Sequence, residues 1–428
     1  MSFLKDTLSV GISKVLMIAF GLATTILIAR TLGPEKNGII ASLLVYPSLF
    51  MTIGSLGIRQ STAYFLGKNI YTETQIKTAV SQIWFLSSVI SLITCFCLIY
   101  FISSSGDNLI LVFLAILPIP FSLFNTYNSG IFLGKNEIGI FNKINWIPTL
   151  IILLVTIVLV WWFSFDIVGY MIALIGGPVF MFVVLLFKNK FIKAFSFQFE
   201  WQIVKKMLSL GLIYAFALLI INLNYQLDII IMDKLSTPYE IGIYSKGAAI
   251  TQYLWQIPMM LSTIVFARGV TSKDTYGFSL KVSQLLRISV LAIGLGSVFL
   301  FLFSDWVIVG MFGEKFKGSI SVLNLLLPGV LLLTIFKVMN MDLAGRGKPW
   351  ISLKAMIPAL LVNIILNIFW IPNFGANGAA LASTVSYSMA ALLFLYFYSK
   401  EVCIPIKTII SYKISDFAPI FQLLKKFK

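Results

Sequence analysis

Several charged side chains stand inside long apolar stretches or at their ends, where charges are unusual. Lys246 and Lys337 have several apolar residues on both sides, and Arg59 ends such a stretch. A charge inside a bilayer is costly, so residues of this kind usually line a cavity or pair with one another. Because cations outnumber carboxylates in these stretches, a water-filled cavity lined by them would bind an anion. The sequence therefore predicts a cationic substrate-binding cavity formed by Arg30, Arg59, Lys246 and Lys337.

Asp228 is the one carboxylate that we place inside an apolar stretch. It lies in the segment NLNYQLDIII, which also holds two asparagines and a glutamine. This position predicts one of two roles. Asp228 binds a proton or Na⁺ during a transport cycle, or it forms a structural ion pair with Lys246 or Lys234. The sequence leaves both roles open.

Groups that enzymes and metalloproteins use are scarce. The chain has no histidine, which removes imidazole as a base, a proton relay or a metal ligand. The three cysteines, at 95, 97 and 403, indicate no disulfide framework and no zinc site. No GxxxxGK[ST] loop for a nucleotide is present. We therefore expect no catalytic residue, no metal and no cofactor, and energy for transport would come from an ion gradient, the membrane potential or downhill flow of substrate.

Composition indicates which solvent surrounds the chain. Of the 428 residues, 59% are hydrophobic and 11% are charged, whereas soluble domains carry about 25% charged residues. These residues cannot cover a water-soluble surface, so we predict an integral membrane protein. The net charge of +16 lies mostly in short loops, where basic residues set the topology. No nucleic-acid partner is expected.

About 20 apolar residues cross a bilayer as a helix, and twelve such stretches follow one another. They are Ser9–Ile28, Ile39–Leu56, Val80–Phe101, Leu109–Phe132, Ile144–Phe163, Val168–Phe187, Leu208–Met232, Ile241–Val265, Ile288–Phe303, Ile320–Met339, Ile351–Trp370 and Gly378–Phe397. With a cytoplasmic N-terminus, 23 lysines and arginines lie on the inner side and 5 on the outer side. Because basic loops stay in the cytoplasm, we predict an all-α membrane protein of about twelve transmembrane helices with both termini cytoplasmic.

The two halves of the chain repeat one another. The turn Arg30–Ser42 (RTLGPEKNGIIAS) returns 204 positions later as Lys234–Ser245 (KLSTPYEIGIYS), with Pro and Gly at matching places. Prolines inside the stretches match at offsets of 210 or 211, namely Pro47 with Pro258, Pro118 with Pro328 and Pro148 with Pro358. Each half starts on the same side, so the repeat is parallel, as in transporters with two rocking lobes.

These features divide the chain into four parts. We predict an N-terminal six-helix lobe over 1–190, a cytoplasmic interfacial linker over 191–207, a C-terminal six-helix lobe over 208–399 and a basic amphipathic cytoplasmic tail over 400–428. The linker and the tail are cationic and half apolar, so we expect them to contact the lipids of an anionic inner leaflet.

Four stretches resemble the Wzx-type O-antigen flippases, which belong to the multidrug/oligosaccharidyl-lipid/polysaccharide (MOP) exporter superfamily. They are IARTLGPEKNGIIASLL, LDIIIMDKLSTPYEIGIYSKGAAI, LNLLLPGVLLLTIFKVMNMDLAGRGKPW and IPNFGANGAALAS. Arg30 matches the arginine that precedes the family's Leu-Gly-Pro turn, and Asp228 and Lys234 match polar positions around the second such turn. Together the stretches run from Ile28 to Ser383, which is most of the chain.

The resemblance implies a multi-pass protein of the bacterial inner membrane. Such a protein would move an undecaprenyl-diphosphate-linked oligosaccharide from the cytoplasmic to the periplasmic leaflet by alternating access, with cationic residues on the diphosphate and sugar acids. Its partners would be this substrate, membrane lipids, and a polysaccharide polymerase and chain-length regulator.

Three alternatives remain at this stage. A multidrug exporter of the same superfamily should carry carboxylates for cationic drugs, and we place only Asp228 in the membrane. A membrane polysaccharide polymerase or ligase needs catalytic groups on a sizeable outward loop, and the predicted outward loops are short. A lipid II flippase would have two further C-terminal spans, for which the tail has no apolar stretch of sufficient length.

Overall fold

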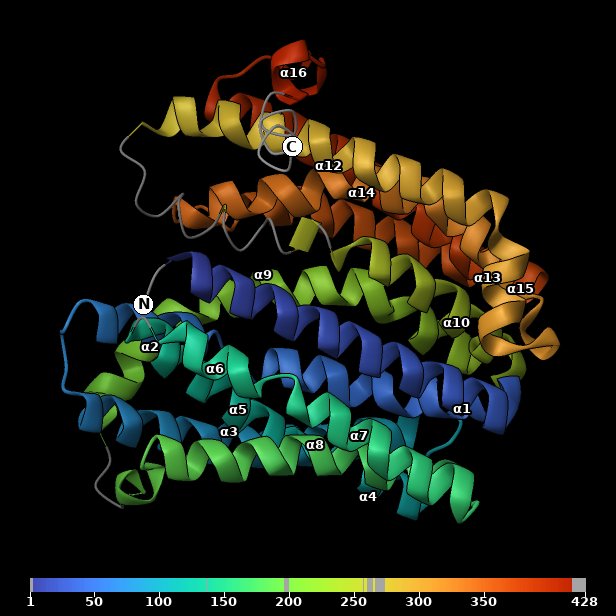
Figure 1. Cartoon of the computed structure of the whole chain (residues 1–428), viewed down its shortest axis with the longest axis horizontal. Coiled ribbons are helices and arrows are strands. Elements are labelled where there is room, and N and C mark those ends of the chain that lie inside the picture. Colours follow the sequence, from blue (N-terminus) through green and yellow to red (C-terminus); the bar gives the residue numbers. More distant parts are fainter. Residues whose placement is uncertain are drawn as a thin grey trace. The chain divides into compact units, whose positions relative to one another are not determined.

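A computed structural model describes residues 3–135, 137–195, 200–256, 258, 259, 265 and 274–417. In this part of the chain the regular structure is entirely helical (Figure 1). The reason is physical, because a bilayer offers no partners to backbone N–H and C=O groups, and a helix satisfies these groups within itself.

The predicted spans agree with the helices. Nine stretches of the described chain are long and apolar enough to cross a membrane. Two of them, Gly11–Gly67 and Ile351–Val402, each hold two predicted spans, which brings the number to eleven. The eighth predicted span begins as a helix and then continues into residues outside the described part. The prediction of an all-α membrane protein of about twelve spans is confirmed, whereas the side on which the termini lie stays a prediction.

The first of two compact units comprises Met1–Asn222 and Thr237–Gly242. Its buried apolar core lies where α2, α3, α5, α8 and the start of α9 meet, with Phe65, Phe124 and Met207 among its members. In chain order its elements are α1 (Phe3–Ile53), α2 (Ile58–Gly67), α3 (Glu73–Ile102), α4 (Leu109–Ile116), α5 (Pro118–Gly134), α6 (Ile138–Ile144), α7 (Ile147–Thr156), η1 (Ile157–Trp162), α8 (Asp166–Lys188), η2 (Phe191–Ala194) and the first part of α9 (Trp201–Leu235).

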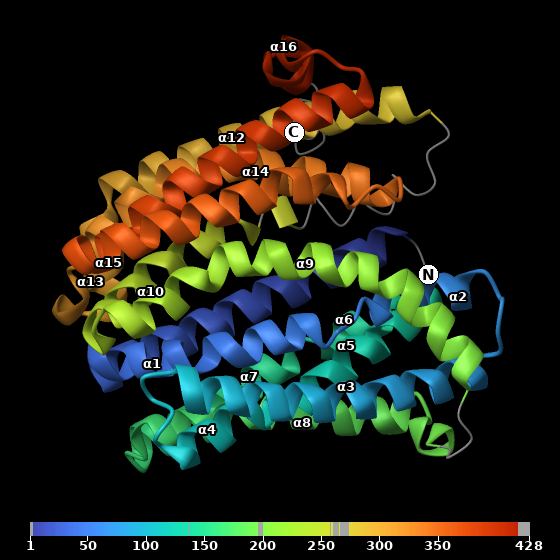
Figure 2. The ribbon, with the colours of Figure 1, turned by 180° about the vertical axis from the view of Figure 1, so that it is seen from behind.

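The second unit comprises Leu223–Ser236 and Ile243–Lys428. Within it α12, α14 and α15 lie side by side in both views (Figure 1, Figure 2). Its elements are the end of α9, most of α10 (Pro238–Leu254), α12 (Thr275–Leu302), α13 (Ser304–Phe312), η3 (Glu314–Phe316), α14 (Ser319–Gly345), α15 (Ile351–Val402), α16 (Ile406–Ile410) and η4 (Ile414–Phe417). The predicted lobe boundaries, with a linker over 191–207, stay a prediction.

Helix α15 is broken at Gly375. The φ of this glycine is 53° and its ψ is −129°, a conformation that only glycine adopts readily. The break separates the eleventh predicted span from the twelfth and reverses the chain between them (Figure 2). Residues from both halves of α15 can therefore face the same space. A corresponding break at Gly33 separates the first span from the second in α1.

The repeated turns contact each other within the first unit. A Cβ atom on Gly38 would lie 1.7 Å from the carbonyl oxygen of Pro238, and one on Gly242 would lie 2.0 Å from that of Pro34. The contact is reciprocal, because each turn's glycine packs on the other turn's proline. The matched Pro and Gly residues of the sequence repeat are thus the residues through which the two turns approach.

Candidate functional site

A fully buried carboxylate, Asp228 on α9, lies at the centre of a polar cluster in the second unit. Its Oδ2 accepts hydrogen bonds from the hydroxyls of Tyr244, at 2.5 Å, and Ser383. Its Oδ1 accepts from the side-chain amides of Asn363, at 3.0 Å, and Asn367, at 2.7 Å. We call these five residues the Asp228 cluster.

Three helical segments supply the donors to Asp228 of α9. Tyr244 comes from α10, two residues after Gly242 of the repeated turn. Asn363 and Asn367 lie one turn apart on the first half of α15, so they share a face. Ser383 comes from the second half of the same helix. The break at Gly375 is therefore what allows one helix to donate to Asp228 from two directions.

The donors around Asp228 are all neutral. Among the described residues, no ion pair shorter than 4.0 Å joins this carboxylate to Lys246, Lys234 or any other cation. The structural ion pair that the sequence left open is thus not formed. In addition, Oδ1 of Asn367 is buried and accepts no hydrogen bond. The cluster thus holds a buried carboxylate that pairs with none of the described cations, and an amide oxygen with unused acceptor capacity.

The second unit also holds two of the four predicted cavity cations. Lys246 lies on α10 and is 6% exposed. Lys337 lies on α14, where its Nζ approaches the rings of Trp255 and Tyr225 at 4.0 and 4.3 Å. Lys337 therefore interacts with aromatic faces in this structure, a partner that the sequence did not predict.

The other two predicted cations belong to the first unit. Arg30 is an exposed residue of α1, three positions before the break at Gly33. Arg59 is an exposed residue in the first turn of α2, two positions after Gly57, whose φ is 62°. Each unit thus holds two of the four predicted cations. Their union in a single cavity stays a prediction.

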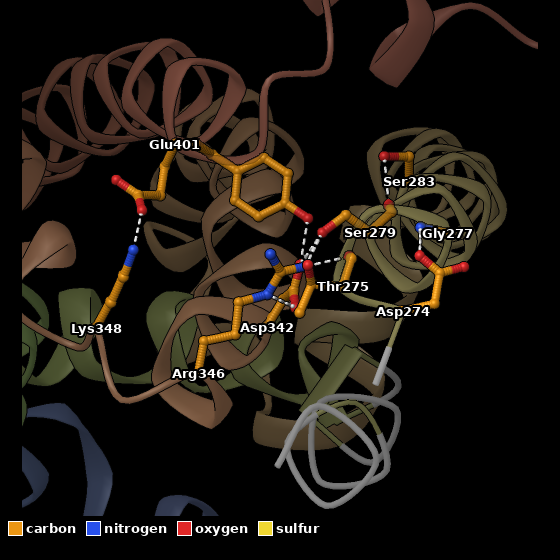
Figure 3. A network of polar contacts seen from close by, with 10 residues as sticks. Asp274, Thr275, Gly277, Ser279, Ser283, Asp342, Arg346, Lys348 and Glu401 are labelled. Atoms are coloured by element: carbon orange, nitrogen blue, oxygen red, sulfur yellow. Dashed lines mark hydrogen bonds and ion pairs between the residues drawn. The ribbon is translucent and has the colours of Figure 1, made fainter. Parts of the chain in front are cut away.

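A second buried carboxylate, Asp342 on α14, was missed by the sequence analysis (Figure 3). Arg346, one turn later, donates from Nε to Oδ1 of Asp342 at 2.9 Å and from Nη2 to Oδ2 at 3.1 Å. Oδ2 also accepts from Ser279 of α12 and Tyr398 of α15, at 2.5 and 2.6 Å. Arg346 in turn donates to the carbonyl oxygen of Thr275 at 2.6 Å. This Asp342 cluster joins α12, α14 and α15 at one end of the unit.

Helices α14 and α9 carry further carboxylates beyond the predicted ends of their spans, and the placing of Asp228 as the one carboxylate inside a span stays a prediction. The tenth span was ended at Met339, but α14 continues to Gly345 and buries Asp342 completely. Likewise α9 continues past Met232 and leaves Asp233 only 3% exposed. The Asp342–Arg346 pair at i and i+4 stabilises a helix, and this spacing was the feature that could have extended the predicted span.

A third carboxylate fastens the segment that follows α15. Asp416 of η4 accepts from Arg287 of α12 through both oxygens, at 2.6 and 2.7 Å. Arg287 also donates to the backbone oxygens of Thr408 and Ile409 at 3.1 and 2.9 Å. These hydrogen bonds from Arg287 hold the pKa of Asp416 below its usual range. The predicted cytoplasmic tail thus packs on α12 as far as residue 417, and residues 418–428 lie outside the described part.

Long apolar helices, two compact units and buried polar clusters define an α-helical membrane transporter fold. The fold is similar to that of a solved structure titled lipid II flippase MurJ, inward closed conformation, with a TM-score of 0.76 and 16% identity over 97% of this chain and 95% of that one. The sequence of residues 3–267 matches the family described as polysaccharide biosynthesis protein. The chain belongs to this family, and its resemblance to the Wzx-type flippases is confirmed.

Named relatives agree with this assignment. A putative O-antigen transporter of Shigella flexneri is 24% identical over 87% of this chain and 92% of that protein. A probable low-salt glycan biosynthesis flippase of Haloferax volcanii is 22% identical over 42% of this chain, a match that spans only 38% of that relative. Family and fold are those of transporters, so the chain is a multi-pass membrane transporter and not an enzyme.

Proposed function

We propose that this protein flips an undecaprenyl-diphosphate-linked oligosaccharide, of the kind used to build O-antigen, from the cytoplasmic to the periplasmic leaflet of a bacterial inner membrane. The family match and the Shigella relative support the class of cargo. The observation that carries the mechanism is the Asp228 cluster, a buried carboxylate with neutral donors only.

On the substrate side, the proposal assigns the diphosphate to cationic side chains. Arg30, Arg59, Lys246 and Lys337 are the candidates, and a diphosphate forms strong charge-assisted hydrogen bonds with such groups. A multidrug exporter of cationic compounds would need carboxylates facing its cargo. Asp342 is instead paired with Arg346, and the hydrogen bonds of Asp228 come from its own neutral neighbours, which favours an anionic cargo.

On the energy side, Asp228 binds the coupling cation. A lone buried carboxylate is costly, and a proton or Na⁺ entering the cluster removes this cost. Oxygens of a carboxylate, an amide and a hydroxyl are the ligands that a hard cation prefers, and Oδ1 of Asn367 has acceptor capacity left. Filling and emptying this site as the lobes alternate would drive the return of the empty cavity.

Two partners complete the proposal. A polysaccharide polymerase and a chain-length regulator in the same membrane would receive the flipped unit. The general test is deletion of the gene followed by analysis of lipid-linked units and surface glycan. Accumulation of the lipid-linked unit with loss of the surface glycan is the expected result, and normal surface glycan contradicts the proposal.

The mechanistic test uses Asp228→Asn, which imitates a permanently neutral carboxyl. In vesicles, uptake of the lipid-linked unit should respond to an imposed Na⁺ or pH gradient with the wild-type protein and lose that response with Asp228→Asn. Asp305→Asn is the matched control, because Asp305 is an exposed carboxylate in the first turn of α13. A normal gradient response of Asp228→Asn refutes the coupling role.

A further inference from the structure

Two aromatic rings contact the ammonium group of Lys337, and a third ring packs against these two. The ring centroids of Trp255 and Tyr225 lie 4.0 and 4.3 Å from Nζ and 5.5 Å from each other. Tyr387 completes the group, with its ring centroid 5.8 Å from both. A cation is attracted electrostatically to aromatic faces, and the attraction is stronger when the site is shielded from water. We call Tyr225, Trp255 and Tyr387 the aromatic cage.

Two members of the cage lie one helical turn from the Asp228 cluster. Tyr225 precedes Asp228 by three residues on α9, and Tyr387 follows Ser383 by four residues on α15. Residues three or four apart share a helix face. A change in the distance between α9 and α15 at the Asp228 cluster therefore changes the position of these two rings as well.

The third member is fixed to the helix that carries Lys337. The indole Nε1 of Trp255 donates to the backbone oxygen of Val330 on α14 at 3.2 Å. Trp255 thus stays with Lys337 when α9 and α15 move. Of the titratable groups that face Asp228, Tyr244 comes from α10 and Tyr387 from α15, and the charge of Asp228 acts on both hydroxyls. In the cage the ring of Trp255 is thus the fixed wall, whereas the rings of Tyr225 and Tyr387 are movable walls whose positions follow the Asp228 cluster.

We propose that the aromatic cage couples the cation site at Asp228 to the availability of Lys337 for an anionic lipid diphosphate. This inference rests on the proposed function. A proton or Na⁺ at Asp228 holds α9 to α15 and keeps the ring of Tyr387 packed on that of Tyr225, which itself lies against the ammonium. When the cation leaves, the two walls loosen and the ammonium turns to the diphosphate. The two ligands therefore oppose each other, and by linkage each weakens the other equally.

The test measures the affinity of the purified full-length protein for undecaprenyl diphosphate in detergent. One arm exchanges Na⁺ for K⁺ at constant ionic strength, and the other compares acidic with alkaline pH, so that the arms separate Na⁺ from the proton. For the wild type we expect the coupling cation to weaken binding by about fivefold or more. Tyr387→Leu removes a movable wall and should abolish this dependence, whereas Tyr387→Phe keeps the ring and should retain it.

A second measurement separates coupling from a purely structural role. Thermal stabilisation by the coupling cation reports the Asp228 site itself, and it should persist in Tyr387→Leu. Lys337→Met should lower the affinity for undecaprenyl diphosphate with or without the cation and leave the thermal stabilisation unchanged. Such a combination does not arise from general damage to the fold.

Two outcomes contradict the inference in distinguishable ways. If the wild type binds undecaprenyl diphosphate with a cation dependence that Tyr387→Leu leaves intact, the cage is not the coupling element and the proposed function survives. If cations change neither binding nor thermal stability of the wild type, Asp228 is not a coupling site, and both proposals fail together.

Discussion

Asp228 and Asp342, two of the buried carboxylates of the second unit, differ in how their charge is balanced. Asp342 has Arg346 one turn away on the same helix, and the pair is joined by two hydrogen bonds. Asp228 has four donors, and all of them are neutral. In a balanced pair the protein itself supplies the opposite charge, so the pair favours a single arrangement of its helices. The charge of an unbalanced carboxylate is neutralised only when a proton or a metal cation binds to it. Its surroundings therefore change with the binding of that cation.

The largest expected effect concerns the balanced pair. Asp342→Ala leaves Arg346 as an uncompensated charge and removes the acceptor of Ser279 and Tyr398. Breaking a buried ion pair costs about 3–5 kcal/mol, so the detergent-solubilised variant should unfold at a much lower temperature. Arg346→Ala should behave alike, and the double variant should lose less than the two single losses added together. An unfolding temperature of Asp342→Ala equal to that of the wild type would show that Asp342 does not hold the helices.

The next effect concerns the unbalanced carboxylate. The wild type should gain about 2.7 kcal/mol of stability when its coupling cation is present at a hundred times its dissociation constant. Asp228→Asn should lose this gain, because the amide carries no charge for a cation to balance. Unfolding temperatures measured in Na⁺ against K⁺, and across pH, give the comparison, and Asp305→Asn again serves as the control. Equal cation stabilisation in Asp228→Asn and the wild type would place the cation elsewhere.

A third, local effect tests a balanced pair outside the spans. The pKa of Asp416 is lowered in the folded protein by Arg287, so the carboxylate contributes stability above the unfolded pKa of about 3.9. This contribution is lost as the pH falls through the lower folded pKa. The protection of residues 404–417 against amide exchange, relative to the intrinsic rate at each pH, should therefore be constant from neutral pH down to about pH 4 and fall below it. Asp416→Asn should raise exchange in this segment at neutral pH. Unchanged exchange would show that other contacts hold it.

The smallest effect is expected in the first unit. Glu73 on α3 accepts from Lys77 and Lys135, both at 2.6 Å, and Lys135 stands where the repeat places Arg346 in the second half. The side chains of Glu73 and Lys135 are each about one-third exposed. Exposed ion pairs contribute less than about 1 kcal/mol to the stability of a protein. Lys135→Ala should shift the unfolding temperature only slightly, with a shift that shrinks at high salt. A loss comparable to that of Arg346→Ala would remove the distinction between exposed and buried pairs.

The sequence predicted the features that depend on neighbouring residues. Hydropathy alone located the spans, because each crossing requires an apolar stretch of its own. The Pro and Gly spacing pointed to the two turns that pack on each other through Gly38 and Gly242. Asp228 stood out as a carboxylate among apolar residues.

Features that depend on residues far apart in the chain were missed. Asn363, Asn367 and Ser383 are uncharged, so nothing in the apolar stretches marked them as donors to Asp228, although the i and i+4 spacing of the two asparagines on one helix face was visible. The aromatic cage gathers residues from α9, from the turn directly after α10 and from α15, and rings are common in membrane helices. Asp342 was missed because a charged residue was taken as the end of the predicted span. The same criterion therefore excluded a charged residue that could have been recognised as important.

The interlocked turns have a consequence for biosynthesis. The first unit includes Thr237–Gly242, which the ribosome makes only after Leu223–Ser236 of the second unit. Until Gly242 has emerged, the backbone around Pro34 and Gly38 lacks the turn that packs on it. The first unit therefore cannot complete its packing while its own continuous stretch is the only part inserted. Its final assembly must wait for α9 and the start of α10 to enter the membrane.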